Sequence, residues 1–160
     1  MKKPTIELKR LETFASLTEE TPAYSAKLYV DGKLFAEVTN RGHGGPDDYR
    51  FAAGQSWDTL KELDARIAAT YPSHEFYGKT FEESLEILCH NMALRHIEMK
   101  NFRSALSRKV MVRVDGKVYD IKGKKTPQML EACRKKYGAD NVLNDMSVED
   151  AFAVVEKGSK

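Results

Sequence analysis

Apolar and polar residues alternate along two neighbouring segments near the N-terminus. Residues 23–30 and 33–39 each repeat with a period of two, which is typical of strands with one buried face. The apolar faces coincide only if the loop between them has three residues, so we predict the loop 30–32 with Gly32 in the left-handed conformation. This register predicts three cross-strand pairs: Leu28 with Leu34, Ala26 with Ala36, and Tyr24 with Val38.

A second hairpin is predicted in the C-terminal half. Residues 110–114 and 117–121 flank Asp115-Gly116, a dipeptide that favours a two-residue type I′ turn. That turn places Val110 opposite Ile121 and Val112 opposite Tyr119. A looser alternation over residues 5–14 and a short edge strand over residues 141–144 complete the predicted strands.

Helical spacing of apolar residues predicts two helices in the middle of the chain. The first begins after Ser56 as N-cap and ends near Thr70. The second begins with a capping box formed by Thr80 and Glu83 and continues to about residue 107, which makes it roughly 40 Å long.

Two shorter helices are predicted near the C-terminus. One begins at Thr126 with Pro127 in its first turn and ends near Gly138, and the other begins at Ser147. Together these elements predict an α+β fold, in which two hairpins form a mostly antiparallel sheet packed against one long and three shorter helices. We expect one domain over residues 1–160, with subdomains 1–79 and 80–160 as the alternative.

Composition excludes several classes of protein. The 160 residues are 41% hydrophobic and 31% charged with a net charge of +2, unlike a disordered chain or a nucleic-acid coat. No apolar run approaches the length of a membrane span, and the N-terminal residues do not form a signal-peptide core, so we expect a cytoplasmic protein without a membrane partner. The two cysteines, Cys89 and Cys133, are expected to be reduced thiols within the core.

The most unusual segment is the glycine-rich loop, residues 41–50. Its glycines would let backbone N–H groups approach an anion, and its arginines could bind phosphate in bidentate fashion. The spacing matches neither a Walker loop nor a dinucleotide fingerprint, and a wide structural turn capped by Asp47 and Asp48 is the alternative. The candidate ligand-binding residues here are Arg41, Gly42, His43, Gly44, Gly45, Asp48, Tyr49 and Arg50.

The same loop offers a catalytic alternative. His43 with Asp47 or Asp48 could act as a general base, since a carboxylate orients an imidazole and stabilises its protonated form. The sequence identifies no nucleophile, so a hydrolase or transferase centred on His43 ranks below a binding function. The other histidines, residues 74, 90 and 96, lack the spacing of paired ligands on one helical face, and we expect no metal and no cofactor.

A second anion-binding candidate is the basic loop, residues 122–126. It joins the second hairpin to a helix whose first N–H groups would face an anion. The alternative is a solvated basic turn with an ordinary N-cap. Its candidate residues are Lys122, Lys124, Lys125 and Thr126.

The long predicted helix and the segment that follows it leave two further partners open. Basic residues from Arg95 to Lys117 leave a nucleic-acid partner open, but the nearby glutamates offset them and do not favour it. The apolar stripe of the helix is expected to be core, and a homodimer interface is the alternative.

Several segments resemble small uncharacterised proteins of phages, prophages and mobile elements. The resemblance lies in residues 16–24 (SLTEETPAY), 28–33 (LYVDGK), 40–49 (NRGHGGPDDY) and 119–124 (YDIKGK). It implies an accessory protein in the host cytoplasm and brings no assigned activity. We therefore expect a non-enzymatic protein that sequesters a small anionic ligand, such as a signalling nucleotide, and so counteracts host defence. The alternative is a module that inhibits or recruits a host protein.

Overall fold

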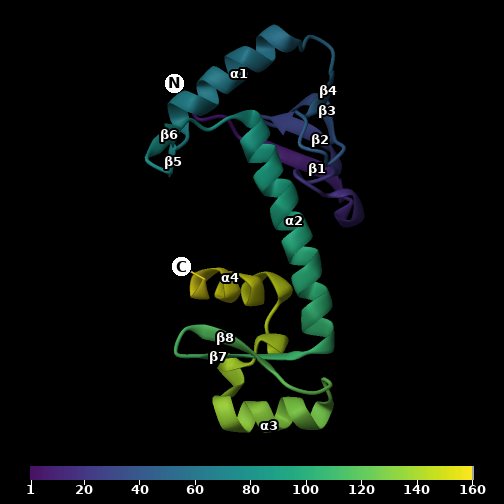
Figure 1. Ribbon diagram of the computed structural model, residues 1–160, viewed down its shortest axis with the longest axis vertical. Helices are drawn as coiled ribbons and strands as arrows, with labels where there is room; N and C mark the ends of the chain where they lie inside the picture. Colours follow the sequence, from purple (N-terminus) through teal and green to yellow (C-terminus); the bar gives the residue numbers. More distant parts are fainter. Residues whose placement is uncertain (160) are drawn as a thin grey trace. The chain divides into compact units, whose positions relative to one another are not determined.

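The computed structural model describes residues 1–159 and confirms the predicted α+β class (Figure 1). Its contacts divide the chain into unit 1, Met1–Ile97, and unit 2, Glu98–Lys160. Helix α2 (Leu85–Arg108) supplies its first half to unit 1 and its second half to unit 2. The two predicted hairpins belong to separate sheets, one in each unit.

Unit 1 contains a four-stranded antiparallel sheet in the order β1-β2-β3-β4. The strands are β1 (Ile6–Thr13), β2 (Tyr24–Val30), β3 (Lys33–Asn40) and β4 (Asp48–Phe51). A single 3₁₀ turn, η1 (Ala15–Leu17), lies between β1 and β2. Residues 41–47 of the glycine-rich loop connect β3 to β4 at one end of this sheet, and the prediction of a loop is wrong for Asp48 to Arg50, which pair with β3 as part of β4.

Two helices cover the apolar face of the sheet. Helix α1 (Trp57–Thr70) begins at Ser56 as predicted, with the Ser56 hydroxyl accepting from the Thr59 N–H. Its buried Ile67 and the buried Cys89 of α2 share one core with Leu28 of the central strand β2. The sheet and the first half of α2 are thus held together by apolar packing, which fixes the α2 side chains that face the end of the sheet.

The predicted register of the first hairpin is wrong, although its strands are correct. The turn has only two residues, Asp31 and Gly32, with φ of 49° and 80°. Tyr29 lies opposite Leu34 and Leu28 opposite Ala36, so Phe35 is an extra, bulged residue. The observed pairs are Leu28 with Ala36, Ala26 with Val38, and Tyr24 with Asn40. The bulge restores the parity that the apolar pattern requires, and it buries Phe35 as well as Ala36.

The predicted start of the long helix is also wrong. Residues 74–81 form a small hairpin, β5 (His74–Phe76) and β6 (Lys79–Phe81), and Thr80 lies within its second strand. Helix α2 begins at Leu85, whose N–H donates to the Asp64 carboxylate of α1 at 2.8 Å. The Ser84 hydroxyl accepts the Ile87 N–H at 3.3 Å, so Ser84 is the local N-cap in place of Thr80, and Asp64 supplies a second, distant acceptor for the first turn.

Unit 2 encloses the second hairpin between two helices. The strands β7 (Val110–Val114) and β8 (Lys117–Ile121) pair in the predicted register. Val110 and Val112 pack with Cys133 of α3 (Pro127–Tyr137). The alternate residue, Met111, packs with Ala151 of α4 (Val148–Gly158). Both faces of the hairpin are therefore buried, and Figure 1 shows it between the two helices.

In unit 2 the predicted helix N-caps are correct, but the predicted edge strand is not. The N-caps Thr126 and Ser147 are confirmed, because each side chain accepts the expected backbone N–H. The predicted edge strand 141–144 is wrong: this segment belongs to two 3₁₀ turns, η2 (Ala139–Asn141) and η3 (Leu143–Asp145), with one isolated bridge between Val112 and Val142. The Asn144 side chain takes the hydrogen bond that a strand would make, accepting from the Met111 N–H at 2.9 Å.

Both cysteines are free and buried, which confirms the prediction of reduced core thiols. In residues 1–159, no helix combines the length and apolar character needed to cross a bilayer.

Candidate functional site

The glycines of the glycine-rich loop hold the chain segment that precedes β2. The Gly42 carbonyl accepts backbone N–H groups from Glu19 at 3.0 Å and Glu20 at 3.1 Å. In turn, the Gly42 N–H donates to Asn40 Oδ1 at 2.8 Å, and the Gly44 N–H donates to Thr21 Oγ1 at 3.2 Å. Two of the three glycine N–H groups are therefore used inside the protein, which favours the structural interpretation of these glycines.

Apart from Asp47, the charged side chains of the glycine-rich loop lie at the surface. His43 Nδ1 lies 3.1 Å from the Glu19 carboxylate, and both side chains are exposed. Arg50 lies 3.8 Å from Glu37 of β3. Together with neighbouring residues the loop surrounds a depression of about 310 Å³, lined by Asn40, Arg41, His43, Gly45, Pro46 and Asp48. The described partner of His43 is Glu19, and the carboxylate of Asp47 points elsewhere.

Asp47 is a buried carboxylate with several hydrogen-bond donors. Its Oδ2 accepts from the Tyr24 hydroxyl at 2.7 Å, and its Oδ1 accepts from Asn40 Nδ2 at 2.9 Å. His90 Nε2, from helix α2, donates to the same Oδ1 at 3.0 Å. The network connects β2, β3, the glycine-rich loop and α2 through one charged group, so Asp47 fixes the loop against the core.

Glu86 extends this network toward solvent. It precedes His90 by one turn of α2, and its Oε1 lies 3.8 Å from His90 Nε2. Ligand atoms of Asp47, Glu86 and His90 all lie within 4.8 Å of one another. We call this group the Asp47 cluster. It joins one imidazole to two carboxylates, one buried and one partly exposed.

The Asp47 cluster shifts the titration of its neighbours. The hydrogen bond to Asp47 raises the pKa of His90, and the nearby Glu86 carboxylate adds to the same effect. Burial, together with the Asp47 charge, raises the pKa of the Tyr24 and Tyr49 hydroxyls. The tyrosines therefore stay neutral and act as hydrogen-bond donors, whereas His90 favours its charged form.

Sequence reasoning did not identify His90, Glu86, Tyr24 or Asn40 as members of this site. One signal was present, because Glu86 and His90 are separated by four residues in a helical segment and must share one face. The pairing of Asp47 with His90 spans 43 residues and could not be read from spacing.

The basic loop lies in unit 2 and meets the end of α2. The Lys125 N–H donates to the Arg108 carbonyl at 3.4 Å, which brings the loop beside a second basic segment. Lys122, Lys124 and Lys125 are exposed, and no carboxylate pairs with them within residues 1–159. Thr126 uses its hydroxyl to cap the Met129 N–H at 3.1 Å. The glycine-rich loop and the basic loop thus belong to different units.

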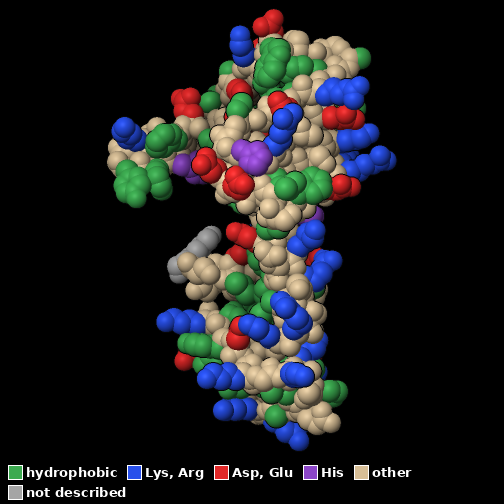
Figure 2. Space-filling model, turned by 45° about the vertical axis from the view of Figure 1, so that its right-hand side comes forward, with side chains coloured by type: hydrophobic (Ala, Val, Ile, Leu, Met, Phe, Trp, Pro, Cys, Tyr) green, Lys and Arg blue, Asp and Glu red, His purple; other side chains and the backbone are tan. Residues whose placement is uncertain are grey.

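Charge is distributed unequally along the chain. The sequence of residues 98–160 has fourteen lysines and arginines against nine acidic residues, a net charge of +5, while residues 1–97 have a net charge of −3. Figure 2 shows lysine and arginine side chains over much of the visible surface of unit 2. The overall charge of +2 conceals this difference, and an anionic partner would be attracted to unit 2.

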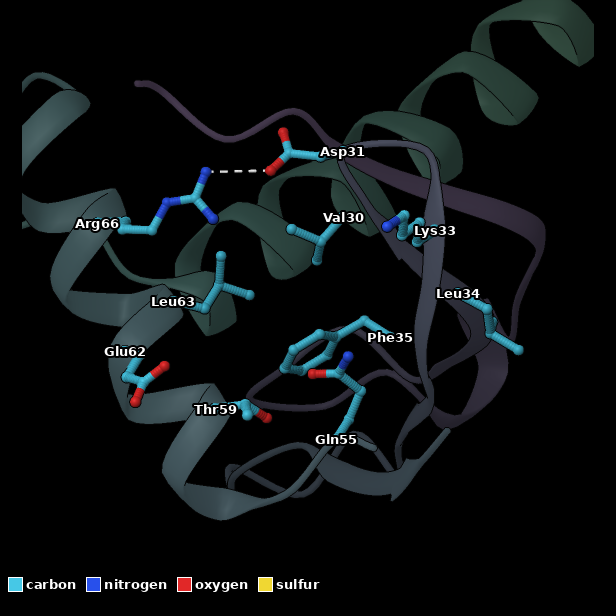
Figure 3. A pocket seen from close by; sticks show the side chains of 10 residues that line it. All are labelled: Val30, Asp31, Lys33, Leu34, Phe35, Gln55, Thr59, Glu62, Leu63 and Arg66. Carbon is cyan, nitrogen blue, oxygen red and sulfur yellow. Dashed lines mark hydrogen bonds and ion pairs between the residues drawn. The ribbon is translucent and has the colours of Figure 1, made fainter. Parts of the chain in front are cut away.

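Unit 1 also has a pocket of about 350 Å³ between the β2–β3 turn and α1 (Figure 3). Phe35, the bulged residue, and Leu63 of α1 form apolar walls. Arg66 closes one end by an ion pair with Asp31 at 3.0 Å. The pocket therefore offers more apolar than polar surface, and the guanidinium of Arg66 is already paired with Asp31.

Comparison with models of protein families, with curated proteins and with solved structures finds no match.

Proposed function

We propose that this is a non-enzymatic binding protein that captures a phosphate-bearing anion through the basic loop of unit 2. The observation that carries the proposal is a set of exposed lysines, Lys122, Lys124 and Lys125, without carboxylate partners in the described chain. Some basic side chains elsewhere in unit 2 do pair with carboxylates, as in Lys109 with Asp120 at 3.1 Å and Arg134 with Asp145 at 2.7 Å.

The position of the basic loop strengthens its attraction for an anion. It leads directly into α3, whose N-terminus carries a partial positive charge, although Pro127 has no N–H and the Met129 N–H is already capped by Thr126. The hydrogen bond from Lys125 to the Arg108 carbonyl places another basic residue near the loop. Unpaired cations beside a helix N-terminus favour a dianionic phosphate over a single carboxylate.

The phosphate could belong to a free nucleotide or to a nucleic-acid backbone. A free nucleotide suits the role that the resemblance implies, in which an accessory protein of a phage or mobile element sequesters a host signalling nucleotide. A nucleic acid would engage several lysines at once and would bind in a strongly salt-dependent way. Both sources present the same phosphate group, so binding must be measured with a nucleotide probe and with a nucleic-acid probe to distinguish them.

We expect the double substitution Lys124→Ala/Lys125→Ala to weaken phosphate binding about tenfold or more, because it removes two unpaired charges next to α3. The measurement is fluorescence anisotropy with a labelled nucleotide, a labelled single strand and a labelled duplex, each titrated at several salt concentrations. For a duplex, loss of two phosphate contacts should lower the slope of log K against log salt by about 2.

The matched control is Lys135→Ala/Lys136→Ala, which removes two exposed lysines from the other end of the same helix. It should change affinity much less. Equal affinity of the Lys124/Lys125 variant and the unmodified protein for every probe would exclude the basic loop as the site. Arg41→Ala tests the glycine-rich loop separately, because that loop lies in unit 1.

A protein-interaction function is the second candidate, and the β5–β6 hairpin favours it. Its tip exposes Phe76 and Tyr77, which are 63% and 91% exposed and stack edge to face at 4.5 Å. Such aromatic side chains are common at the centre of protein interfaces. Figure 2 shows apolar side chains at the surface of unit 1.

We expect Phe76→Ser/Tyr77→Ser to abolish capture of any protein that binds through this hairpin, because it removes both exposed rings without touching the core. Cross-linking in host lysate, followed by mass spectrometry, compares this variant with the unmodified chain. Tyr119→Ser, which removes an exposed ring from unit 2, is the control. A partner retained equally by all three chains would place the interface elsewhere.

A further inference from the structure

We infer that Asp47, Glu86 and His90 form a binding site for a divalent transition-metal ion such as Zn²⁺. The proposal concerns unit 1 and is independent of anion binding by the basic loop. It follows from the positions of three ligand atoms that come from two separate parts of the chain.

The distances between these atoms suit a single ion. His90 Nε2 lies 3.0 Å from Asp47 Oδ1 and 3.8 Å from Glu86 Oε1, and all three ligand atoms lie within 4.8 Å of one another. One point therefore exists at no more than about 2.4 Å from each atom, compared with bond lengths of about 2.0 to 2.2 Å for zinc with nitrogen and oxygen ligands. A small movement of the partly exposed Glu86 side chain completes the approach.

Asp47 is held in the orientation that a metal ligand needs. Its Oδ2 accepts from the Tyr24 hydroxyl at 2.7 Å and lies 3.5 Å from the Tyr49 hydroxyl. Its Oδ1 accepts from Asn40 Nδ2 at 2.9 Å. The same Oδ1 also lies 3.0 Å from His90 Nε2. Hydrogen bonds of this kind around a ligating carboxylate fix its geometry and raise metal affinity.

Asn40 is itself fixed. Its Oδ1 accepts from the Gly42 N–H at 2.8 Å and from the Thr21 hydroxyl at 2.8 Å, so its amide nitrogen must face Asp47. This gives the glycine-rich loop a further purpose, since the positive φ of Gly42 brings its N–H to Asn40. The loop holds the residue that orients the buried ligand.

The other two ligands sit on a rigid helix. Glu86 and His90 are one turn apart on α2, and the buried Leu85 and Cys89 anchor that turn in the core. The Glu86 side chain is 41% exposed and that of His90 is 19% exposed, so an ion can enter from solvent. Three protein ligands leave at least one coordination position for water.

The donor set selects the class of metal. An imidazole with two carboxylates suits Zn²⁺ or Mn²⁺, whereas Ca²⁺ requires six to eight oxygen ligands and Mg²⁺ keeps most of its water. The competing explanation is that a proton on His90 alone holds the two carboxylates together. Metal titration of the intact chain separates the two.

The test is calorimetric titration of chelator-treated protein with ZnCl₂ and, separately, MnCl₂. We expect one ion per chain for the unmodified protein and at least tenfold weaker binding for Glu86→Gln, which removes one ligand and leaves the buried Asp47 network in place. Glu82→Gln, which neutralises an exposed acid just before α2, is the matched control and should bind as the unmodified chain does.

Two exposed histidines could bind zinc on their own, because His43 faces Glu19 at 3.1 Å and His74 faces Glu83 at 2.7 Å. His43→Gln and His74→Gln should leave the single site unchanged, and the NMR signals of the His90 ring should shift at one equivalent of zinc. Binding that survives Glu86→Gln, that is lost in His43→Gln or His74→Gln, or that never reaches one ion per chain would overturn the proposal.

Discussion

Replacing Gly42 by alanine is expected to destabilise unit 1 by about 2–4 kcal/mol. Gly42 has φ of 86°, a conformation that an alanine adopts only with strain, and an added Cβ would collide with the Leu17 carbonyl oxygen. Because that oxygen belongs to the backbone, it cannot move aside as a flexible side chain could. The measurement is the free energy of unfolding from urea denaturation of the full chain.

Gly45→Ala is the control for this prediction. It lies three residues away in the same loop, its φ is not positive, and no heavy atom lies within 4 Å of a Cβ placed there. We expect its free energy of unfolding to stay within about 0.5 kcal/mol of the unmodified value. Similar stability of the two variants would mean that the glycine-rich loop does not pack on Leu17.

Replacing Asp47 by asparagine is expected to cost about 3 kcal/mol of stability. The substitution keeps the shape of the side chain but removes the charge that accepts from Tyr24, Asn40 and His90. An amide nitrogen in place of one oxygen would face a donor, so a buried polar group loses its partner. Urea denaturation at pH 6, in buffer with a chelator, measures the loss.

Asp48→Asn is the matched control, because Asp48 is the exposed neighbour of Asp47 and should tolerate the change within about 0.5 kcal/mol. The cost at Asp47 should also depend on pH. Since Asp47 raises the pKa of His90 above its ordinary 6.5, their pairing stabilises the folded state fully below about pH 6.5 and is lost as pH rises through the raised pKa. A destabilisation that grows with pH would contradict this pairing.

The first hairpin shows how far a local pattern determines register. The alternation of apolar residues correctly predicts that an odd number of residues lies outside the regular pairing of the two strands. It does not say whether the extra residue lies in the turn or in a bulge. The structure places it at Phe35, where the ring packs into the core and stacks edge to face on Phe51 at 6.0 Å. The apolar pattern is compatible with an extra residue in the turn or in a bulge, and tertiary packing determines that it lies in the bulge.

The candidate sites differ in the same way. The basic loop could be predicted from the sequence because its cations, its N-cap Thr126 and Pro127 are consecutive along the chain. The composition of the glycine-rich loop is unusual and was evident from the sequence. The hydrogen bonds from its Gly42 and Gly44 N–H groups to Asn40 and Thr21 could not be predicted from the sequence. The spacing of the histidines did not predict a metal site at His90, because the partners of His90 are carboxylates on the same helix and on a distant loop.

The sequence by itself determined the elements whose signals are local. Capping residues such as Ser56, Thr126 and Ser147, the Asp115-Gly116 turn and the burial of both cysteines follow from chemistry within a few residues. The tertiary structure alone decided the bulge at Phe35 and the meeting of Asp47 with His90. Each of these depends on groups far apart in the chain, and their mutual distances are set by packing of the whole core rather than by any pattern along the sequence.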